Sequence, residues 1–151
     1  MSEQHYEQLK LENQLCFPLY ACSREVIKKY RPYLDEIGLT YTQYVAMMVF
    51  WEEDAISVKE LGRRLYLDSG TLTPVLKSLE QKGYITRRRS AEDERVLIAA
   101  LTSEGRALQD AAAKIPQQIG GCIPMQPEDA FLLHKLLYKL LHSIEPHAER
   151  E

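Results

Sequence analysis

Residues 57–101 constrain the fold of this chain more than any other part of its sequence. Apolar residues recur at helical spacing in two short segments, which predicts helices near 58–65 and over 69–82. Two strands, Tyr84–Arg88 and Val96–Leu101, are expected to follow around a polar turn. A helix-turn-helix followed by a hairpin predicts a mainly α fold with a small β-wing, a winged helix-turn-helix.

Polar residues at the predicted helix starts support this interpretation. Ser57 with Glu60, and Thr40 with Gln43, have capping-box spacing, in which a hydroxyl and a later side chain satisfy amides that the helix leaves free. Asp68 is placed to cap the second helix of the pair. Helices are therefore expected to begin directly after each of these caps.

The flanking segments are also expected to be helical. We predict one long helix over 6–33, kinked or restarted at Pro18, and another over 41–53. A further helix is predicted over 102–116, and a last one over 127–144. This last helix has an apolar surface too broad for a lone exposed helix, so we expect a homodimer. The chain then forms one domain, 1–151, with dimerisation helices about 6–33 and 103–145 and a winged-helix lobe about 40–102.

Composition excludes several classes of protein. The longest apolar run, Tyr44–Trp51, is too short to cross a membrane, and the polar N-terminus does not resemble a signal peptide, so we expect a cytoplasmic protein. The three cysteines are expected to rest as thiols there. The four histidines form no zinc-type cluster with them, and neither a metal nor a cofactor is expected. These histidines are His5, His134, His142 and His147.

Charge is unevenly distributed, with net +3 over residues 57–106 and −6 over the rest of the chain. Taken alone, the second helix of the pair is typical of any capped surface helix, and a charged hairpin is usually just solvated. Together, in this order, they favour binding of double-stranded DNA, with the helix in a major groove and the wing on phosphates or in a minor groove. The candidate DNA-binding residues are Ser69, Thr71, Thr73, Lys77, Arg87, Arg88, Arg89, Asp93 and Arg95.

The segment LGRRLYLDSGTLTPVLKSLEQKGYITRRRSAEDERVLIAALTSEG resembles the core of the multiple-antibiotic-resistance regulator (MarR) family, and DERVLIAALT resembles its wing signature. The resemblance implies an obligate dimer whose two winged lobes read successive major grooves. The operator would be an inverted repeat with half-sites about one DNA turn apart.

The segment LKLENQLCFPLYACSREVIKKYRPYLDEIGLTYTQY resembles the organic-hydroperoxide-resistance regulator (OhrR) branch of that family. The resemblance implies that Cys16 is a peroxide-reactive thiol, that Tyr30 and Tyr41 of the partner subunit donate hydrogen bonds to its thiolate, and that Cys122 is the resolving cysteine of the two-cysteine type. Without this resemblance, Cys16 would be interpreted as an inert apolar residue of a helix, and Tyr30 and Tyr41 as residues of surface packing. Cys122 is expected in a mobile loop from Gly120 to Pro127.

The expected function is a repressor that leaves its operator when Cys16 is oxidised by an organic hydroperoxide or a related oxidant such as hypochlorite or a quinone. Cys22 is a poor disulfide partner, because on one helix it lies about 9 Å along the axis from Cys16 and on another face. Two end products of Cys16 oxidation are considered, a disulfide with Cys122 and a mixed disulfide with a small thiol. Three alternatives are a repressor controlled by a non-covalent phenolic ligand, a thiol peroxidase and a purely structural helical protein.

Overall fold

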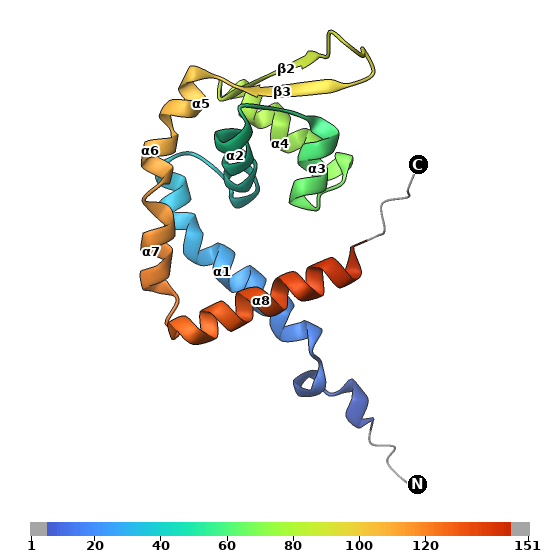
Figure 1. Cartoon of the computed structure of the whole chain (residues 1–151). Coiled ribbons are helices and arrows are strands. Elements are labelled where there is room, and N and C mark those ends of the chain that lie inside the picture. The colour runs from blue at the N-terminus through green and yellow to red at the C-terminus, as the bar shows by residue number, and fades with distance from the viewer. Residues whose placement is uncertain (1–5, 146–151) are drawn as a thin grey trace. The chain divides into compact units, whose positions relative to one another are not determined.

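The structure is a computed structural model that describes residues 6–145, and His5 and His147 lie outside this range. The chain divides into two compact units, with the boundary between Ile119 and Gly120. Helices account for most of the described residues, and a small sheet accompanies them in the first unit (Figure 1). The elements of the first unit up to the sheet's last strand are α1 (Cys16–Glu36), α2 (Tyr41–Glu53), β1 (Ala55–Ser57), α3 (Val58–Leu65), α4 (Ser69–Gln81), β2 (Ile85–Arg89) and β3 (Leu97–Leu101).

The predicted helix from Tyr6 is wrong in its first part, because α1 begins only at Cys16. Two 3-10 turns, Glu7–Leu9 and Leu11–Asn13, precede it. The Asn13 and Gln14 side chains donate to backbone carbonyls in these turns at 2.7–2.9 Å and so compete with a continuous helix. Pro18 then lies in the first turn of α1, where a helix needs no amide donor.

The hydroxyl and carboxylate caps are confirmed, but only Thr40 with Gln43 forms the full capping box, because the Glu60 side chain accepts from Arg63 and not from the Ser57 amide. The Thr40 hydroxyl accepts from the Gln43 amide at 3.3 Å, and the Gln43 side chain accepts in return from the Thr40 amide at 3.0 Å. Ser57 caps α3 by accepting from the Glu60 amide at 3.1 Å. Asp68 caps α4 by accepting from the Thr71 amide at 2.8 Å. Helices α2, α3 and α4 accordingly begin where the sequence indicates.

The hairpin is confirmed within one residue at each strand, and it belongs to a three-stranded antiparallel sheet of order β1-β3-β2. Ile85 pairs with Leu101 and Arg89 with Leu97. The sequence did not predict β1, which is only three residues long and pairs Ala55 with Ala100. The sheet therefore connects the wing to the segment between α2 and α3.

Most of the hydrophobic core lies within the winged lobe, on α2, α3, α4 and the sheet; outside it, Leu34, Leu39, Ala112, Ile115 and Ile119 are also buried. Trp51 of α2 donates its indole N–H to the Gly105 carbonyl at 2.9 Å, which ties the core to the segment after the sheet. At Gly105 a Cβ would lie 2.2 Å from the Tyr84 carbonyl oxygen, so glycine is required there. The largest fully buried side chains of the lobe are Tyr44, Phe50, Met47, Leu61, Leu72, Leu76, Leu79 and Ile85.

The predicted helix over 102–116 is wrong in its continuity and its end. Three short helices occupy this region: α5 (Ser103–Ala107), α6 (Gln109–Ala112) and α7 (Ile115–Cys122). Pro116 lies in the first turn of α7, where proline is tolerated, instead of ending a helix. Cys122 is the last residue of α7, so the expectation that Gly120, Gly121 and Cys122 form a loop is also wrong.

The second unit contains α8 (Pro127–Ile144), which confirms the predicted last helix. Pro127 is its first residue, and no residue of α8 is buried. Apart from Leu141, which is half-buried, the large apolar side chains of α8 are exposed, including Phe131 at 74% and Ile144 at 66%. Among residues 6–145, no helix has the length and apolar character needed to cross a membrane.

Candidate redox sensor and DNA-binding surface

Cys16 is the first residue of α1, and its side chain is exposed. Its neighbours Leu15, Phe17 and Leu19 are exposed apolar residues, at 83%, 42% and 42%. The positive end of the α1 dipole lies at this terminus, which favours negative charge nearby. Cys16 is therefore an accessible thiol in an apolar setting, open to an uncharged oxidant.

Three tyrosines form an aromatic cluster between the second half of α1 and the first turn of α2. The ring centroids of Tyr30 and Tyr41 are 5.0 Å apart with the rings edge to face, and Tyr44 lies 6.0 Å from Tyr30 and 6.3 Å from Tyr41. Tyr44 is only 2% exposed, whereas the other two rings are half-buried. The structure thus brings together the two predicted tyrosines and adds a third, which we call the tyrosine cluster.

Burial extends to higher pH the range over which these phenols stay protonated. It raises the pKa of Tyr30, with a smaller contribution from Tyr41, and it also raises the pKa of Tyr41. Burial, with Tyr30 and Tyr41 nearby, raises the pKa of Tyr44 to about 12. A protonated phenol is a hydrogen-bond donor, so the cluster has the chemistry needed to bind an anionic sulfur. Sequence reasoning missed Tyr44, although its spacing of three residues from Tyr41 places both on one face of a helix.

Within one chain, Cys16 and Tyr30 do not meet. Both lie on α1, fourteen residues apart, which corresponds to about 21 Å along the helix axis. A hydrogen bond requires an approach of about 3–4 Å for sulfur. A tyrosine cluster that serves the Cys16 thiol must therefore belong to a second copy of the chain.

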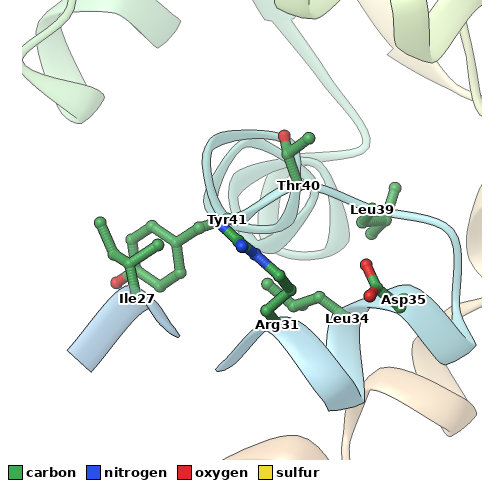
Figure 2. Close-up of a pocket in the computed structure, with 7 residues that line it drawn as sticks. All are labelled: Ile27, Arg31, Leu34, Asp35, Leu39, Thr40 and Tyr41. Carbon is green, nitrogen blue, oxygen red and sulfur yellow. The ribbon is translucent and has the colours of Figure 1, made fainter. Parts of the chain in front are cut away.

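A pocket of about 180 Å³ lies beside the tyrosine cluster, between α1 and the start of α2 (Figure 2). Tyr41 and Ile27 form one side of it, and Arg31 and Asp35 supply opposite charges from α1 (Figure 2). Leu34, Leu39 and Thr40 complete the lining. The pocket has room for a small ligand or for one side chain of a partner.

The third cysteine, Cys122, is half-buried at the end of α7. Cys16 belongs to the first compact unit and Cys122 to the second. Cys22, six residues after Cys16 in α1, is exposed. The described residues contain no group of three or more histidine, cysteine or acidic side chains placed to hold a metal ion.

The predicted DNA-reading residues of α4 lie on its exposed face. Ser69, Thr71, Thr73 and Lys77 all have exposed side chains. The Thr73 hydroxyl donates to the Ser69 carbonyl at 2.7 Å, so its hydrogen is already used inside the helix. The carboxylate of Asp68 caps the helix, and its bond to the Thr71 amide lowers the pKa of that carboxyl group. The cap leaves the side chains after it facing outward.

The arginines of the wing divide into two kinds. Arg87 is half-buried and donates to Glu80 of α4 at 3.1 and 3.2 Å, and this contact lowers the pKa of Glu80. Arg88 and Arg89 are exposed. At the tip, Arg95 is 90% exposed and is held by both carboxylate oxygens of Asp93 at 3.1 and 3.2 Å, which lowers the pKa of Asp93. Arg87 thus fastens the wing to α4, and the other three arginines face solvent.

The fold and the site together define the class of winged-helix transcriptional regulators. The family model of the transcriptional regulator SarA/Rot matches residues 24–112. The organic hydroperoxide resistance transcriptional regulator of Bacillus subtilis (strain 168) is 49% identical over 142 residues, which cover 94% of this chain and 97% of that protein. The chain belongs to the SarA/Rot family of transcriptional regulators, and it is a relative of the organic hydroperoxide resistance regulators, as the sequence predicted.

Two solved structures of AbfR, a protein of Staphylococcus epidermidis, extend the comparison. Reduced AbfR bound to DNA has a TM-score of 0.75 at 40% identity, covering 91% of this chain and 96% of that one. Disulfide-formed AbfR has a TM-score of 0.62 at 39% identity, covering 93% and 96% of the two chains. The predicted winged-helix fold is thereby confirmed.

Proposed function

We propose that this chain is a dimeric transcriptional repressor that binds double-stranded DNA while Cys16 is reduced and releases it when Cys16 is oxidised. The observation that carries the proposal is an exposed thiol at the start of α1 in a chain 49% identical to an organic hydroperoxide resistance regulator. The AbfR structures, one reduced on DNA and one with a disulfide, support a redox-controlled regulator. The inducer is an organic hydroperoxide or a related oxidant.

The proposed chemistry starts with the thiolate of Cys16. Its sulfur attacks one peroxide oxygen, the O–O bond breaks, and the alcohol leaves after taking up a proton, so that Cys16 becomes a sulfenic acid. Tyr30 and Tyr41 of the second subunit donate hydrogen bonds to the thiolate before the attack. The apolar side chains next to Cys16 favour a peroxide with an organic substituent over hydrogen peroxide.

The sulfenic acid then condenses with the thiol of Cys122 of the other subunit, which forms a disulfide and releases water. This bridge changes the separation of the two winged lobes, and the half-sites of the inverted-repeat operator are no longer matched. Loss of 99% of binding requires only about 2.7 kcal/mol, so no unfolding is needed. A mixed disulfide with a small thiol is the other end point.

Dimerisation is part of the proposal for two reasons. The Cys16 thiol needs a tyrosine cluster that its own α1 places about 21 Å away. In addition, α8 exposes apolar side chains along its whole length, more than a soluble monomer normally tolerates. A second copy of the chain meets both requirements, because it supplies a tyrosine cluster for Cys16 and an apolar surface to cover α8.

On DNA, α4 enters the major groove with Ser69, Thr71, Thr73 and Lys77 towards bases and phosphates. Arg88 and Arg89 contact phosphates, and Arg95 enters the minor groove while Asp93 orients its guanidinium. Arg87 supports the same surface from behind through Glu80. The whole domain, 1–151, acts as one regulator.

The test is operator binding by fluorescence anisotropy, with wild type and Cys16→Ser side by side and tert-butyl hydroperoxide as the oxidant. Wild type is expected to release a duplex selected from random DNA, and Cys16→Ser to keep it. Cys22→Ser is the matched control, because it removes an exposed thiol from the same helix and should respond as wild type does. If Cys16→Ser still releases DNA, thiol sensing is wrong.

Non-reducing electrophoresis tests the second step. Wild type treated with the oxidant should run as a linked dimer, and Cys122→Ser should not. A Cys122→Ser protein that nevertheless releases DNA only when a small thiol is present would support the mixed disulfide. Steady consumption of peroxide with a thiol reductant, without sequence-specific DNA binding, would instead identify a thiol peroxidase.

The pocket beside Tyr41 favours one second candidate, a repressor that a small phenolic ligand controls without covalent chemistry. Arg31 and Asp35 would bind the polar groups of such a ligand. The Cys16→Ser variant separates the two functions, because a ligand would release it from DNA and an oxidant would not.

A further inference from the structure

Gln43 is the buried polar side chain of the core formed by residues 6–145, with 7% of its surface exposed. Its Nε2 donates to the Ser78 hydroxyl at 2.9 Å, and its Oε1 accepts from the Thr40 amide at 3.0 Å and from Lys82 Nζ at 3.1 Å. A capping box needs only the bond to Thr40. The bonds to Ser78 and Lys82 cross from α2 to the end of α4 and have no part in capping.

These bonds begin in the first turn of α2, which also carries Tyr41 and Tyr44 of the tyrosine cluster. Gln43 lies in the first turn of α2, between Tyr41 and Tyr44 in the sequence. Lys82, the C-cap of α4, also donates through Nζ to the Gly38 carbonyl, in the turn that joins α1 to α2. The end of α4 is therefore bonded to both the turn before α2 and the first turn of α2.

At the other end, the bonds reach the helix proposed to read DNA. Ser78 follows Lys77 directly, and Thr71 and Thr73 lie on the same helix closer to its N-terminus. The thirteen residues of α4 form one continuous helix about 20 Å long, with Pro74 between Ser78 and the first turn. A shift at its last turn therefore moves the exposed residues of its first turn as well.

Hydrogen bonds in this position resist sliding in a way that apolar contacts do not. Elsewhere α2 packs against α4 through buried apolar side chains, whose attraction has no preferred direction. Separating Gln43 from Ser78 would leave the buried Nε2 group without a partner, which is unfavourable, whereas Oε1 separated from Lys82 would still accept from the Thr40 amide. The first turn of α2 and the last turn of α4 are consequently held so that they move together.

We propose that Gln43 is a positioning residue that couples the tyrosine cluster to α4, so that oxidation at Cys16 changes the placement of the DNA-reading helix. The inference rests on the proposed function. When the second subunit's sulfur is oxidised, Tyr41 loses its thiolate partner and the first turn of α2 shifts. The bonds from Gln43 to Ser78 and Lys82 carry that shift to α4. A residue that acted only as a cap would stabilise both redox states alike.

The test compares Kd for the selected duplex in the reduced and the hydroperoxide-treated protein, and its readout is the ratio of the two values. In wild type we expect a ratio of about 100, within the usual range of coupling between sites. Gln43→Met keeps the length and apolar fit of the side chain and removes its hydrogen bonds. It should lower the ratio about tenfold, or ~1.4 kcal/mol.

Ser78→Ala provides a milder variant that leaves the capping box intact, and it should lower the ratio about threefold in the same direction. Ser57→Ala is the matched control, because it removes the hydroxyl cap of α3 without touching Gln43. It should lower Tm by about 3 °C and leave the ratio unchanged. Circular dichroism reports whether each variant is folded.

The outcomes are distinct. The coupling is supported if the ratio is lowered in Gln43→Met and Ser78→Ala and is the same in Ser57→Ala as in wild type. A large wild-type ratio that both variants retain would overturn the coupling and leave the redox function standing. A wild-type ratio near one would contradict the redox function itself, and the coupling with it.

Discussion

Replacing Tyr44 tests whether the third ring of the tyrosine cluster holds the other two in place. Its side chain is 2% exposed and lies 6.0 and 6.3 Å from the rings of Tyr30 and Tyr41. Tyr44→Leu keeps an apolar side chain in the core but removes both ring contacts. Tyr44→Phe keeps both contacts and removes only the hydroxyl.

The expected magnitudes follow from these contacts. Two aromatic pairs contribute about 1–3 kcal/mol, and the smaller side chain leaves a cavity that costs about 1 kcal/mol more. We therefore expect Tyr44→Leu to lower the free energy of unfolding by roughly 2–4 kcal/mol. Tyr30 and Tyr41 would no longer be held in one orientation towards the Cys16 thiolate, so oxidation should slow by roughly tenfold. Tyr44→Phe should stay close to wild type in rate.

The assay measures the second-order rate constant of Cys16 with tert-butyl hydroperoxide, by mass spectrometry of quenched samples. All proteins compared also carry Cys22→Ser and Cys122→Ser, so that Cys16 is the one cysteine whose oxidation is measured. Phe50→Leu is the control, since Phe50 is a fully buried aromatic residue of the same helix outside the cluster. Phe50→Leu should lower the free energy of unfolding by a similar amount and leave the rate constant of Cys16 oxidation unchanged. Oxidation of Tyr44→Leu at the wild-type rate would refute the reasoning.

Three further predictions concern charge. Burial raises the pKa of Tyr44 to about 12 from an ordinary value of 10.0, so its contribution to stability is full below pH 10 and is lost as the pH rises through 12. Absorbance at 295 nm should show a late tyrosinate component that Tyr44→Phe lacks, and full ionisation of all nine tyrosines by pH 10.5 would contradict this. Arg88→Ala should weaken DNA binding and reduce the salt slope of log K by about 0.9 per lost phosphate contact, whereas Arg87→Ala should leave the slope unchanged. If Arg88→Ala and Arg87→Ala gave equal salt slopes, the distinction between an exposed Arg88 that contacts phosphate and an Arg87 that binds Glu80 would be wrong. Arg87 lowers the pKa of Glu80 from its ordinary value of 4.5, so this pair stabilises the fold above that pH and the contribution is lost as the pH falls. In urea unfolding between pH 3 and 7, the free energy of unfolding should therefore fall less at acid pH in Arg87→Ala than in wild type.

The elements that the sequence predicted are those that local chemistry determines. Thr40, Ser57 and Asp68 each bond an amide three residues later, so their helix starts are visible in a short stretch of sequence. The hairpin is likewise set by two apolar strands around a polar turn. The winged helix and the candidate DNA-reading face of α4 follow from these local signals.

Features that depend on distant contacts were not predicted. β1 is three residues long and exists because β3, more than forty residues later, supplies its pairing partners. The contacts of Gln43 with Ser78 and Lys82 span 35 and 39 residues, so its sequence context indicates only a cap. The start of α1 depends on side-chain bonds of Asn13 and Gln14 that compete with the helix, which apolar periodicity does not reveal.

The position of Cys122 within α7 changes what a disulfide to Cys16 would require. A cysteine in a loop moves freely, whereas the last residue of a helix moves only if the final turn unwinds or the helix moves as a whole. Gly120 and Gly121 make unwinding easy, because each glycine weakens a helix by about 1 kcal/mol relative to alanine. Replacing both by alanine should therefore strengthen the final turn by about 2 kcal/mol and slow the formation of the linked dimer, while the first oxidation of Cys16 proceeds at the wild-type rate. Time-resolved non-reducing electrophoresis measures the first effect and quenched mass spectrometry the second. If the linked dimer forms as fast in the double alanine variant as in wild type, the turn does not unwind, and α7 must move as a unit to bring Cys122 to its partner.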